Sequence, residues 1–357
     1  KPDGVSVLAF FLTAGFCFWG TTILNIWFSF AGVLLFCAVK KKSPGAMANA
    51  FLFSTGLAPL ITEMLFRYPG ESWHGFTALG FALALAVGVV IGFLFPAVLP
   101  HSPKMHKGYD LYNAAVPIGL TAFFLRALLY KVFTPAPPAS EGVGLADSFE
   151  LVSFLFCGVV FGLAILCGLL LGGGRDYPKL LRSTGYNTDF GSELSPAAGI
   201  LNFGVYGVFI VLYYCAVGAA WNAATLGCVF CMVCCCFKGS HPLNVFPIML
   251  GYVAASFIAK FVCGLTGAEF SMAINAQAIV IGLCFANGLS PVAGEYGWLA
   301  GVLFGMAHYT LVTCVPLLHG AFCLYNGGFT AAFCCFLFVP VLETFCKTKA
   351  ERKRLKA

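Results

Sequence analysis

The chain has 357 residues and a formal net charge of +6, with 60% apolar and only 10% charged side chains. A soluble domain carries about 25% charged residues because water must solvate its surface, so this composition excludes a soluble globular enzyme. The 38 Phe and 41 Gly without a three-residue period likewise exclude a disordered or collagen-like chain, and a polytopic membrane protein remains.

Apolar windows bounded by charge, proline or glycine predict an all-α membrane protein with about twelve membrane elements. In chain order the predicted elements are 5–19, 23–39, 46–66, 76–100, 111–134, 149–172, 194–218, 221–236, 242–261, 272–289, 296–318 and 324–346. Elements 5–19 and 221–236 are short for a hydrocarbon core of about 30 Å, so either is expected to be re-entrant or broken. The longest connectors are 135–147, rich in proline and acidic residues, and 172–193, which carries basic residues.

Basic residues gather on one side if every predicted element crosses the membrane once. The tail 347–357 then shares a side with Lys40–Lys42, Lys238 and the connector 172–193, while the other side keeps Arg67 and most loop acids. The positive-inside rule therefore predicts cytoplasmic termini, in what we expect to be a bacterial cytoplasmic membrane. The net charge requires no nucleic-acid partner, and the tail is either a solvated topological signal or a contact for anionic lipid.

The 17 cysteines lie mostly within apolar runs, where cysteine behaves as a small hydrophobic residue. Cys231 and Cys234 have the spacing of a metal or redox pair, but no second pair follows, so neither a metal nor a cofactor is expected. Motifs of zinc hydrolases, nucleophile elbows, phosphate loops and dinucleotide sites do not occur in the sequence. The chain is therefore not expected to be an enzyme.

An internal repeat relates the two halves of the chain through three ordered sets of residues. The first sets are Gly20, Leu24, Asn25 and Gly32, then Gly56 to Pro59 with Glu63, then His106, Leu111, Tyr112 and Asn113. They recur as Gly239, Leu243, Asn244 and Gly251, then Gly288 to Pro291 with Glu295, then His319, Leu324, Tyr325 and Asn326. Matching elements are seven apart, an odd number, which predicts inverted repeats if every element crosses and parallel repeats if one short element in each does not.

The repeat predicts a first unit at 1–134, a two-helix connector at 135–220, a second unit at 221–346 and a basic cytoplasmic tail at 347–357. Element 194–218 precedes the second unit and has no counterpart before Lys1. This difference predicts a further helix upstream in the natural protein.

Pro59 and Pro291 each interrupt an apolar segment after a nearby glycine, Gly56 or Gly288. Proline removes a backbone donor, and lipid tolerates a broken helix only where protein or a water-filled cavity satisfies the freed groups. Paired breaks in inverted halves are typical of substrate sites near the bilayer midplane. The alternative is a pair of packing kinks without a ligand.

Glu63 and Glu295 follow the prolines by one helical turn. A carboxylate at membrane depth is costly, so these residues are expected either to bind protons or cations or to lie at the water interface.

The pairs Tyr112-Asn113 and Tyr325-Asn326 open the last element of each unit, and Gly327 follows the second pair. Asparagine favours helix N-caps, and a free helix N-terminus suits an anion or a polar neutral solute. A capping role with an interfacial tyrosine is the alternative. Asn25, Asn244, His106 and His319 complete the repeated polar set as secondary candidates.

The repeated motifs resemble those of a bacterial and archaeal family of multi-span membrane proteins known as domain of unknown function 1576. The resembling stretches are 15–25, 56–59, 106–113, 240–247, 289–294 and 324–329. The resemblance spans nearly the whole chain and implies no particular activity. The Tyr-Asn-Gly element and the two halves are more faintly similar to urea transporters, which is an analogy of fold.

These observations favour a membrane transporter or channel for a small polar solute, with the pathway between the two units and with coupling to protons or cations left open. The second interpretation is a non-transporting structural subunit of a larger membrane complex, which predicts an interface packed shut by Phe and Leu. The third is an intramembrane enzyme, which requires titratable groups in one pocket. Assembly as a homo-oligomer or in a larger complex stays open.

Overall fold

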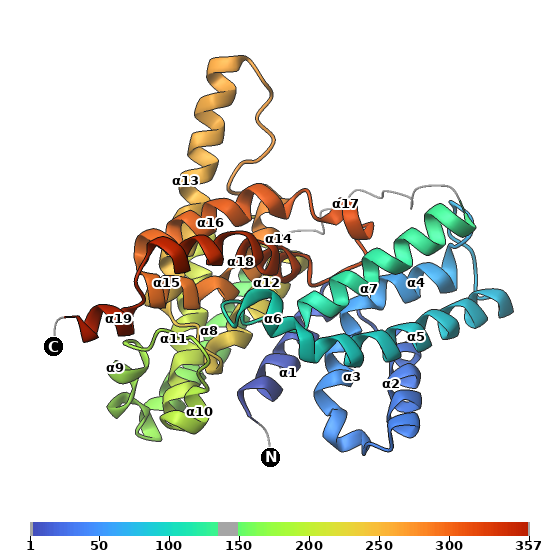
Figure 1. Cartoon of the computed structure of the whole chain (residues 1–357), viewed down its shortest axis with the longest axis horizontal. Coiled ribbons are helices and arrows are strands. Elements are labelled where there is room, and N and C mark those ends of the chain that lie inside the picture. Colours follow the sequence, from blue (N-terminus) through green and yellow to red (C-terminus); the bar gives the residue numbers. More distant parts are fainter. Residues whose placement is uncertain (1–2, 135–148, 356–357) are drawn as a thin grey trace.

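The computed structural model describes residues 3–134 and 149–355, and the predicted connector 135–147 lies outside these ranges. Within them, every regular element is a helix (Figure 1). Nine stretches in the described ranges are long and apolar enough to cross a membrane, and the chain is therefore a polytopic helical membrane protein. Three shorter apolar helices accompany them at Gly4–Cys17, Ile26–Lys40 and Ala223–Phe237.

The first half of the chain forms seven helices. They are α1 (Gly4–Cys17), α2 (Ile26–Lys40), α3 (Ala48–Ser54), α4 (Ala58–Phe66), α5 (Ala78–Val98), α6 (Ser102–His106) and α7 (Ala115–Ala127). The middle contains α8 (Glu150–Leu170), α9 (Tyr177–Leu180), α10 (Phe190–Glu193) and α11 (Pro196–Ala216).

The second half repeats this order of elements. Its helices are α12 (Ala223–Val233), α13 (Pro242–Thr266), α14 (Gln277–Ala286), α15 (Ser290–Tyr296), α16 (Trp298–Val312), α17 (Pro316–His319) and α18 (Asn326–Phe345), followed by α19 (Lys349–Arg354) in the tail. The predicted bounds 272–289 are wrong at both ends, because α14 begins at Gln277 and α15 continues the segment to Tyr296. The predicted start at 111 is also too early, because α7 begins only at Ala115.

The same helix packing occurs in both halves. Helix α2 packs along α5, and α13 packs along α16. Glycines permit the close approach: a Cβ on Gly32 would lie 2.1 Å from the Gly88 carbonyl oxygen, and one on Gly251 would lie 2.9 Å from the Gly305 Cα. Figure 1 places α2 and α13 on opposite sides of the molecule, as it does α5 and α16, and α4 and α15.

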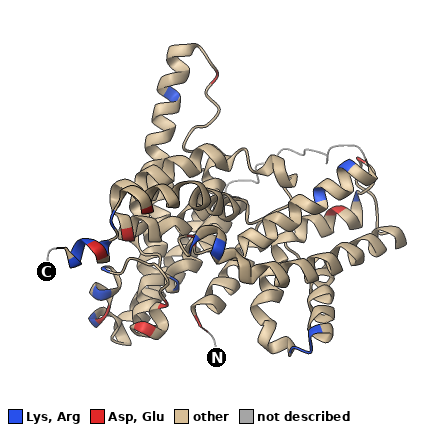
Figure 2. Ribbon diagram, viewed as in Figure 1, with Lys and Arg blue, Asp and Glu red and all other residues tan. Residues whose placement is uncertain are grey.

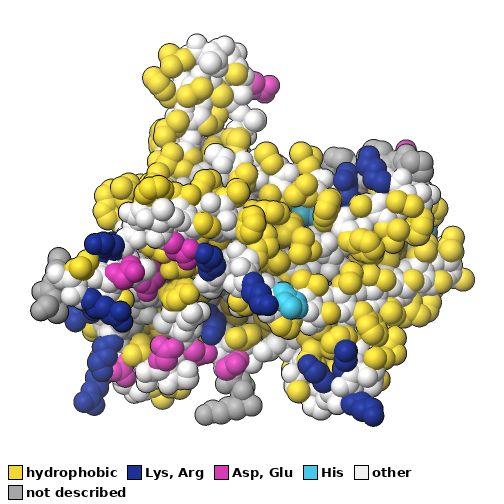
Figure 3. All heavy atoms as spheres, viewed as in Figure 1, with side chains coloured by type: hydrophobic (Ala, Val, Ile, Leu, Met, Phe, Trp, Pro, Cys, Tyr) yellow, Lys and Arg dark blue, Asp and Glu magenta, His cyan; other side chains and the backbone are white. Residues whose placement is uncertain are grey.

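The face of the molecule seen in Figure 3 is mostly apolar. Helix α8 packs against α11 and exposes Leu151, Leu155 and Leu163 on its other face. Charged side chains gather mainly over α9, α10 and α19, and a smaller group lies beside the ends of α4 and α7 (Figure 2). Lipid is the solvent that suits such an apolar surface, because exposed patches of this extent are not stable in water.

The core contains the cysteine-rich segment of α12 and the turn that follows it. Cys228, Cys231, Cys234, Cys235 and Cys236 are all buried with free thiols. Over 3–134 and 149–355, no group of three or more His, Cys, Asp or Glu side chains is placed to hold a metal ion.

Candidate functional site

Both predicted helix breaks occur where the prolines indicated. A turn of 3₁₀-helix at Thr55–Leu57 separates α3 from α4, and a matching turn at Asn287–Leu289 separates α14 from α15. Pro59 and Pro291 each occupy the second position of the helix that follows. Proline is tolerated there because the first turn of a helix leaves its N–H groups unpaired in any case.

The backbone at each break is bound by the opposite half of the chain. The Leu324 amide donates to the Gly56 carbonyl oxygen at 3.0 Å, and the Leu111 amide donates to the Gly288 carbonyl oxygen at 3.1 Å. The two bonds are equivalent, because in each one the leucine before a Tyr-Asn pair binds the helix-break glycine of the other half. They satisfy backbone groups that lipid could not.

A tyrosine ring packs directly on the glycine of each break. A Cβ on Gly56 would lie 2.5 Å from the Tyr325 ring, and a Cβ on Gly288 would lie 2.5 Å from the Tyr112 ring. No larger residue fits without displacing the ring. The structure therefore brings together Gly56 with Tyr325 and Gly288 with Tyr112, residues that the repeat had singled out separately.

The two tyrosines differ in their hydrogen bonding. The Tyr112 hydroxyl lies 2.7 Å from the Cys231 carbonyl oxygen and 2.8 Å from Asn287 Oδ1, and Asn287 in turn donates to the Tyr206 hydroxyl at 3.0 Å. The equally buried Tyr325 hydroxyl has no hydrogen-bond partner. The repeated motifs did not include Asn287, although it directly precedes the repeated glycine, where the first half has Thr55.

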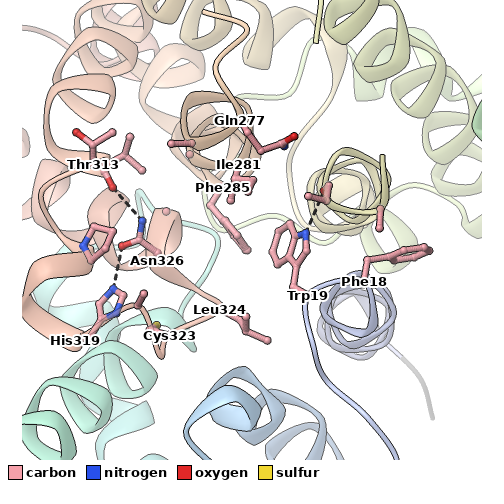
Figure 4. A pocket seen from close by; sticks show the side chains of 18 of the residues that line it. Phe18, Trp19, Gln277, Ile281, Phe285, Thr313, His319, Cys323, Leu324 and Asn326 are labelled. Carbon is pink, nitrogen blue, oxygen red and sulfur yellow. Dashed lines mark hydrogen bonds between the residues drawn. The ribbon is translucent and has the colours of Figure 1, made fainter. Parts of the chain in front are cut away.

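A cavity of about 490 Å³ opens beside the first turn of α18, and we call it the α18 cavity. Its walls are mainly apolar, with Trp19, Ile281 and Phe285 among them (Figure 4). None of the residues that line it in the described ranges is an acid, a lysine or an arginine. Its polar lining consists of Asn222, Gln277, Thr313, His319 and Asn326.

The polar wall of the α18 cavity is ordered by hydrogen bonds. Asn326 donates to the Val312 carbonyl oxygen at 3.0 Å, so its Oδ1 is the acceptor for His319 Nε2, also at 3.0 Å (Figure 4). This bond leaves His319 Nδ1 buried and without a partner, and Gln277 Nε2 is likewise unpartnered. The wall therefore has unused hydrogen-bonding capacity.

A second cavity of about 160 Å³, the α7 cavity, lies beside the start of α7. Alignment of the halves through the repeated residues shows that equivalent positions line both cavities. The pairs are Val5 and Ala224, Phe53 and Phe285, Leu99 and Val312, Pro103 and Pro316, Leu111 and Leu324, Asn113 and Asn326, Ala114 and Gly327, and Lys238 and Trp19. Each cavity is thus lined mainly by one half of the chain, and the other half completes it with Lys238 and Tyr325 at the α7 cavity or Phe18 and Trp19 at the α18 cavity.

Four aromatic residues lie between the α18 cavity and the α7 cavity, and we call them the aromatic barrier: Phe53, Tyr112, Phe285 and Tyr325. Phe285 lines the α18 cavity, and the other three line the α7 cavity. The Phe285 ring centroid lies 5.1 Å from that of Tyr112 and 6.0 Å from that of Tyr325. The barrier is closed by ring packing in this structure.

Asn113 and Asn326 do not meet. Asn326 lines the α18 cavity and Asn113 lines the α7 cavity, on opposite sides of the barrier. The predicted capping role is wrong for both, because α7 begins after Asn113 and the Asn326 amide group is engaged by His319 and Val312 instead. Gly327 also lines the α18 cavity, and its carbonyl oxygen accepts a 2.7 Å hydrogen bond from His308 Nε2.

The repeated carboxylates have different surroundings. Glu63 is buried, lies 2.7 Å from the Arg67 guanidinium and accepts a 2.6 Å hydrogen bond from the Tyr130 hydroxyl. Glu295 is half-buried at the end of α15, and its carbonyl oxygen accepts from Arg352 at 3.1 Å. Neither carboxylate lines the α18 cavity or the α7 cavity.

Asn25 and Asn244 have matching structural surroundings. Asn25 Nδ2 donates to the Gly20 carbonyl oxygen and Asn244 Nδ2 to that of Gly239, both at 2.8 Å. Each side chain therefore closes the turn before α2 or α13. His106, the counterpart of His319, is buried and accepts from the Gly108 amide through Nδ1 at 3.2 Å.

The fold and these breaks define a polytopic helical membrane protein with two repeated halves of like construction. The chain belongs to the family described as "Protein of unknown function (DUF1576)", which matches residues 1–131 and 174–344. No curated protein and no solved structure matches the chain.

Proposed function

We propose that the protein is a membrane transporter for a small polar solute, with the α18 cavity and the α7 cavity as the two ends of one pathway. The observation that carries this proposal is the equivalence of the residues lining the two cavities. Packing alone gives no reason for both halves to keep a cavity at the same place. A duplicated half of a binding site explains why both cavities are present.

We further propose that the halves are inverted repeats in a chain of twelve crossings. The reciprocal hydrogen bonds from Leu111 to Gly288 and from Leu324 to Gly56 support a pseudo-two-fold relation. With cytoplasmic termini, the α7 cavity then faces the cytoplasm and the α18 cavity faces outward. Solute passes when Tyr112 and Tyr325 move from the glycines of the breaks, so the protein is a gated transporter.

The solute is expected to be uncharged. The α18 cavity offers carboxamide, hydroxyl and imidazole groups within apolar walls, and its described lining has no charged group to balance a charged ligand. Among the lining residues, His319 Nδ1 is a buried acceptor and Gln277 Nε2 a buried donor without a partner. Amides and polyols carry hydrogen-bond donors and acceptors that complement these groups.

The alternative is a non-transporting structural subunit of a larger membrane complex. The closed aromatic barrier and the exposed apolar face of α8 favour that alternative. The polar wall of the α18 cavity, with its unused hydrogen-bonding groups, favours transport instead. Catalysis is not proposed, because a reaction centre requires several titratable groups in one pocket.

Flux through proteoliposomes tests the proposal. Vesicles containing the protein are expected to swell faster than empty vesicles in glycerol, acetamide or urea. Ala278→Trp places an indole in the α18 cavity and should abolish the gain, whereas Leu155→Trp, on the exposed face of α8, should leave it unchanged. Equal rates in empty and loaded vesicles for all three solutes, or full flux in Ala278→Trp, would contradict transport.

Thiol labelling tests the two-sided pathway. In a background with the exposed cysteines Cys17, Cys167, Cys215, Cys314 and Cys346 replaced by serine, Thr313→Cys should react with an impermeant maleimide from outside the cell. Asn187→Cys, next to the α7 cavity, should react only in inverted vesicles. Labelling of both variants from the same side would exclude the inverted arrangement.

A further inference from the structure

Asp110 lies buried in the segment between α6 and α7, directly before the repeated Leu-Tyr-Asn motif. Only 1% of its surface is exposed. Its Oδ1 accepts a hydrogen bond from the Tyr112 amide at 2.9 Å, while its Oδ2 is buried with no partner. An ionised carboxylate with an unpaired buried oxygen is costly, so the group requires either a proton or a compensating ligand.

A small pocket of about 110 Å³, the Asp110 pocket, lies beside this residue. The pocket is also lined by Asn113, Thr188 and Lys238, and it shares Asn113 and Lys238 with the α7 cavity. Thr188 Oγ1 is a second buried oxygen without a partner. Water can therefore bridge the carboxyl group and the α7 cavity.

Asp110 also contacts the moving parts of the proposed pathway. A Cβ on Gly288 would lie 2.7 Å from Asp110 Oδ1, so the carboxyl group packs on the helix break of the second half. Its hydrogen-bond donor is the backbone amide of Tyr112, and Tyr112 is a member of the aromatic barrier. A change in the charge of Asp110 therefore acts directly on the break and on the barrier.

The groups that face Asp110 favour a proton over a metal cation. Cys334 and Cys335 approach from α18 as buried thiols, and His106 is a buried imidazole at the end of α6. The Lys238 ammonium, 3.7 Å from Asp189, already supplies a positive charge to the Asp110 pocket and would repel a bound metal ion. Burial raises the pKa of Asp110 to about 7, and the hydrogen bond from Tyr112 opposes this shift.

We propose that Asp110 is a proton-binding site that couples proton movement to solute transport. This step rests on the proposed function. A proton from hydronium in the α7 cavity forms an O–H bond on Asp110 Oδ2, leaving water and a neutral carboxylic acid, and it returns to water when the pathway opens to the other side. The neutral acid stabilises the packing of Tyr112 on Gly288, and ionisation weakens it because the carboxylate draws water into the Asp110 pocket.

The site is present once per chain. The equivalent position in the second half is Cys323, which cannot carry a negative charge at low cost in this buried place. We therefore expect each transport cycle to move one proton.

Infrared difference spectroscopy of the purified protein tests proton binding without any solute. Between about pH 9 and pH 5, the wild type should gain the band of a buried carboxylic acid at a midpoint near neutrality. Asp110→Asn should lose this band, and Glu269→Gln, at an exposed loop carboxylate, should retain it. Persistence of the band in Asp110→Asn, or a band that appears only on removal of Na⁺, would overturn the proposal.

The swelling assay with glycerol, acetamide and urea then tests coupling. Wild-type flux should be about tenfold higher at pH 9 than at pH 5, because ionised Asp110 weakens the packing of Tyr112 on Gly288. Flux through Asp110→Asn should be insensitive to pH. Flux with the same pH dependence in both proteins would overturn the coupling. Absence of flux from every protein would overturn the proposed function, while the infrared result would still decide the proton site.

Discussion

The Tyr112 hydroxyl lies 2.8 Å from Asn287 Oδ1, so a residue at the start of the last element of the first half is bound to the helix break of the second half. The matching tyrosine, Tyr325, packs on the first break in the same way but leaves its hydroxyl unpartnered. The aromatic barrier is therefore symmetric in shape and asymmetric in hydrogen bonding. The second break is the more firmly held of the two.

Removal of each tyrosine hydroxyl should have unequal effects. Tyr112→Phe leaves Asn287 Oδ1 without its donor and should reduce the free energy of unfolding by about 1–3 kcal/mol. Tyr325→Phe is the matched control, because it deletes a buried hydroxyl that has no partner, and it should leave stability unchanged or slightly higher. The many buried thiols permit measurement of both melting temperatures with a thiol-reactive dye. Equal losses of stability in the two variants would contradict the difference in hydrogen bonding between the tyrosines.

Added methyl groups at the breaks should separate the tyrosines from the glycines. Gly56→Ala and Gly288→Ala each place a Cβ 2.5 Å from a ring, and we expect each to cost about 1–3 kcal/mol of stability. Gly45→Ala is the control, since a Cβ there meets no atom within 4 Å. Melting temperatures of Gly56→Ala or Gly288→Ala that match that of Gly45→Ala would show that the rings do not depend on the glycines.

The Glu63–Arg67 pair should be a structural anchor. Glu63→Gln replaces the charged contacts of Glu63 with Arg67 and Tyr130 by neutral ones, and the expected loss of stability is about 1–3 kcal/mol. Glu343→Gln breaks the exposed pair with Lys107 and should cost less than about 1 kcal/mol. Chemical denaturation in detergent compares the two variants. A Glu63→Gln protein that is as stable as Glu343→Gln would refute the anchoring role.

Stability should depend on pH through Asp110. Its folded pKa of about 7 is above the ordinary value of 3.8, so the folded state holds the proton more tightly and loses stability as the pH rises from about 4 to about 7. The loss is at most on the order of 4 kcal/mol. Asp110→Asn lacks this dependence, so its melting temperature should exceed that of the wild type at pH 8.5 but not at pH 4. Melting temperatures that depend on pH in the same way in both proteins would contradict this role of Asp110.

Local sequence was sufficient to predict the helix breaks. Proline at 59 and 291, with glycine three residues earlier, allows few backbone conformations in an apolar segment, and both breaks occur where predicted. The same local reasoning failed for Asn113 and Asn326, which do not cap their helices. Asn326 is the first residue of α18 rather than its cap, and its carboxamide binds His319 and the Val312 carbonyl oxygen.

The sequence by itself determined that this is a helical membrane protein and that its two halves repeat, because composition and motif spacing are properties of the chain alone. Only the tertiary structure decided that the paired asparagines line separate cavities, that Glu63 is bound by Arg67 and Tyr130, and that Asp110 is buried with one free oxygen. The physical reason is that burial and hydrogen bonding depend on segments far apart in the chain. Equivalent motifs acquire different properties when their neighbours differ, as Thr55 and Asn287 do beside the two tyrosines.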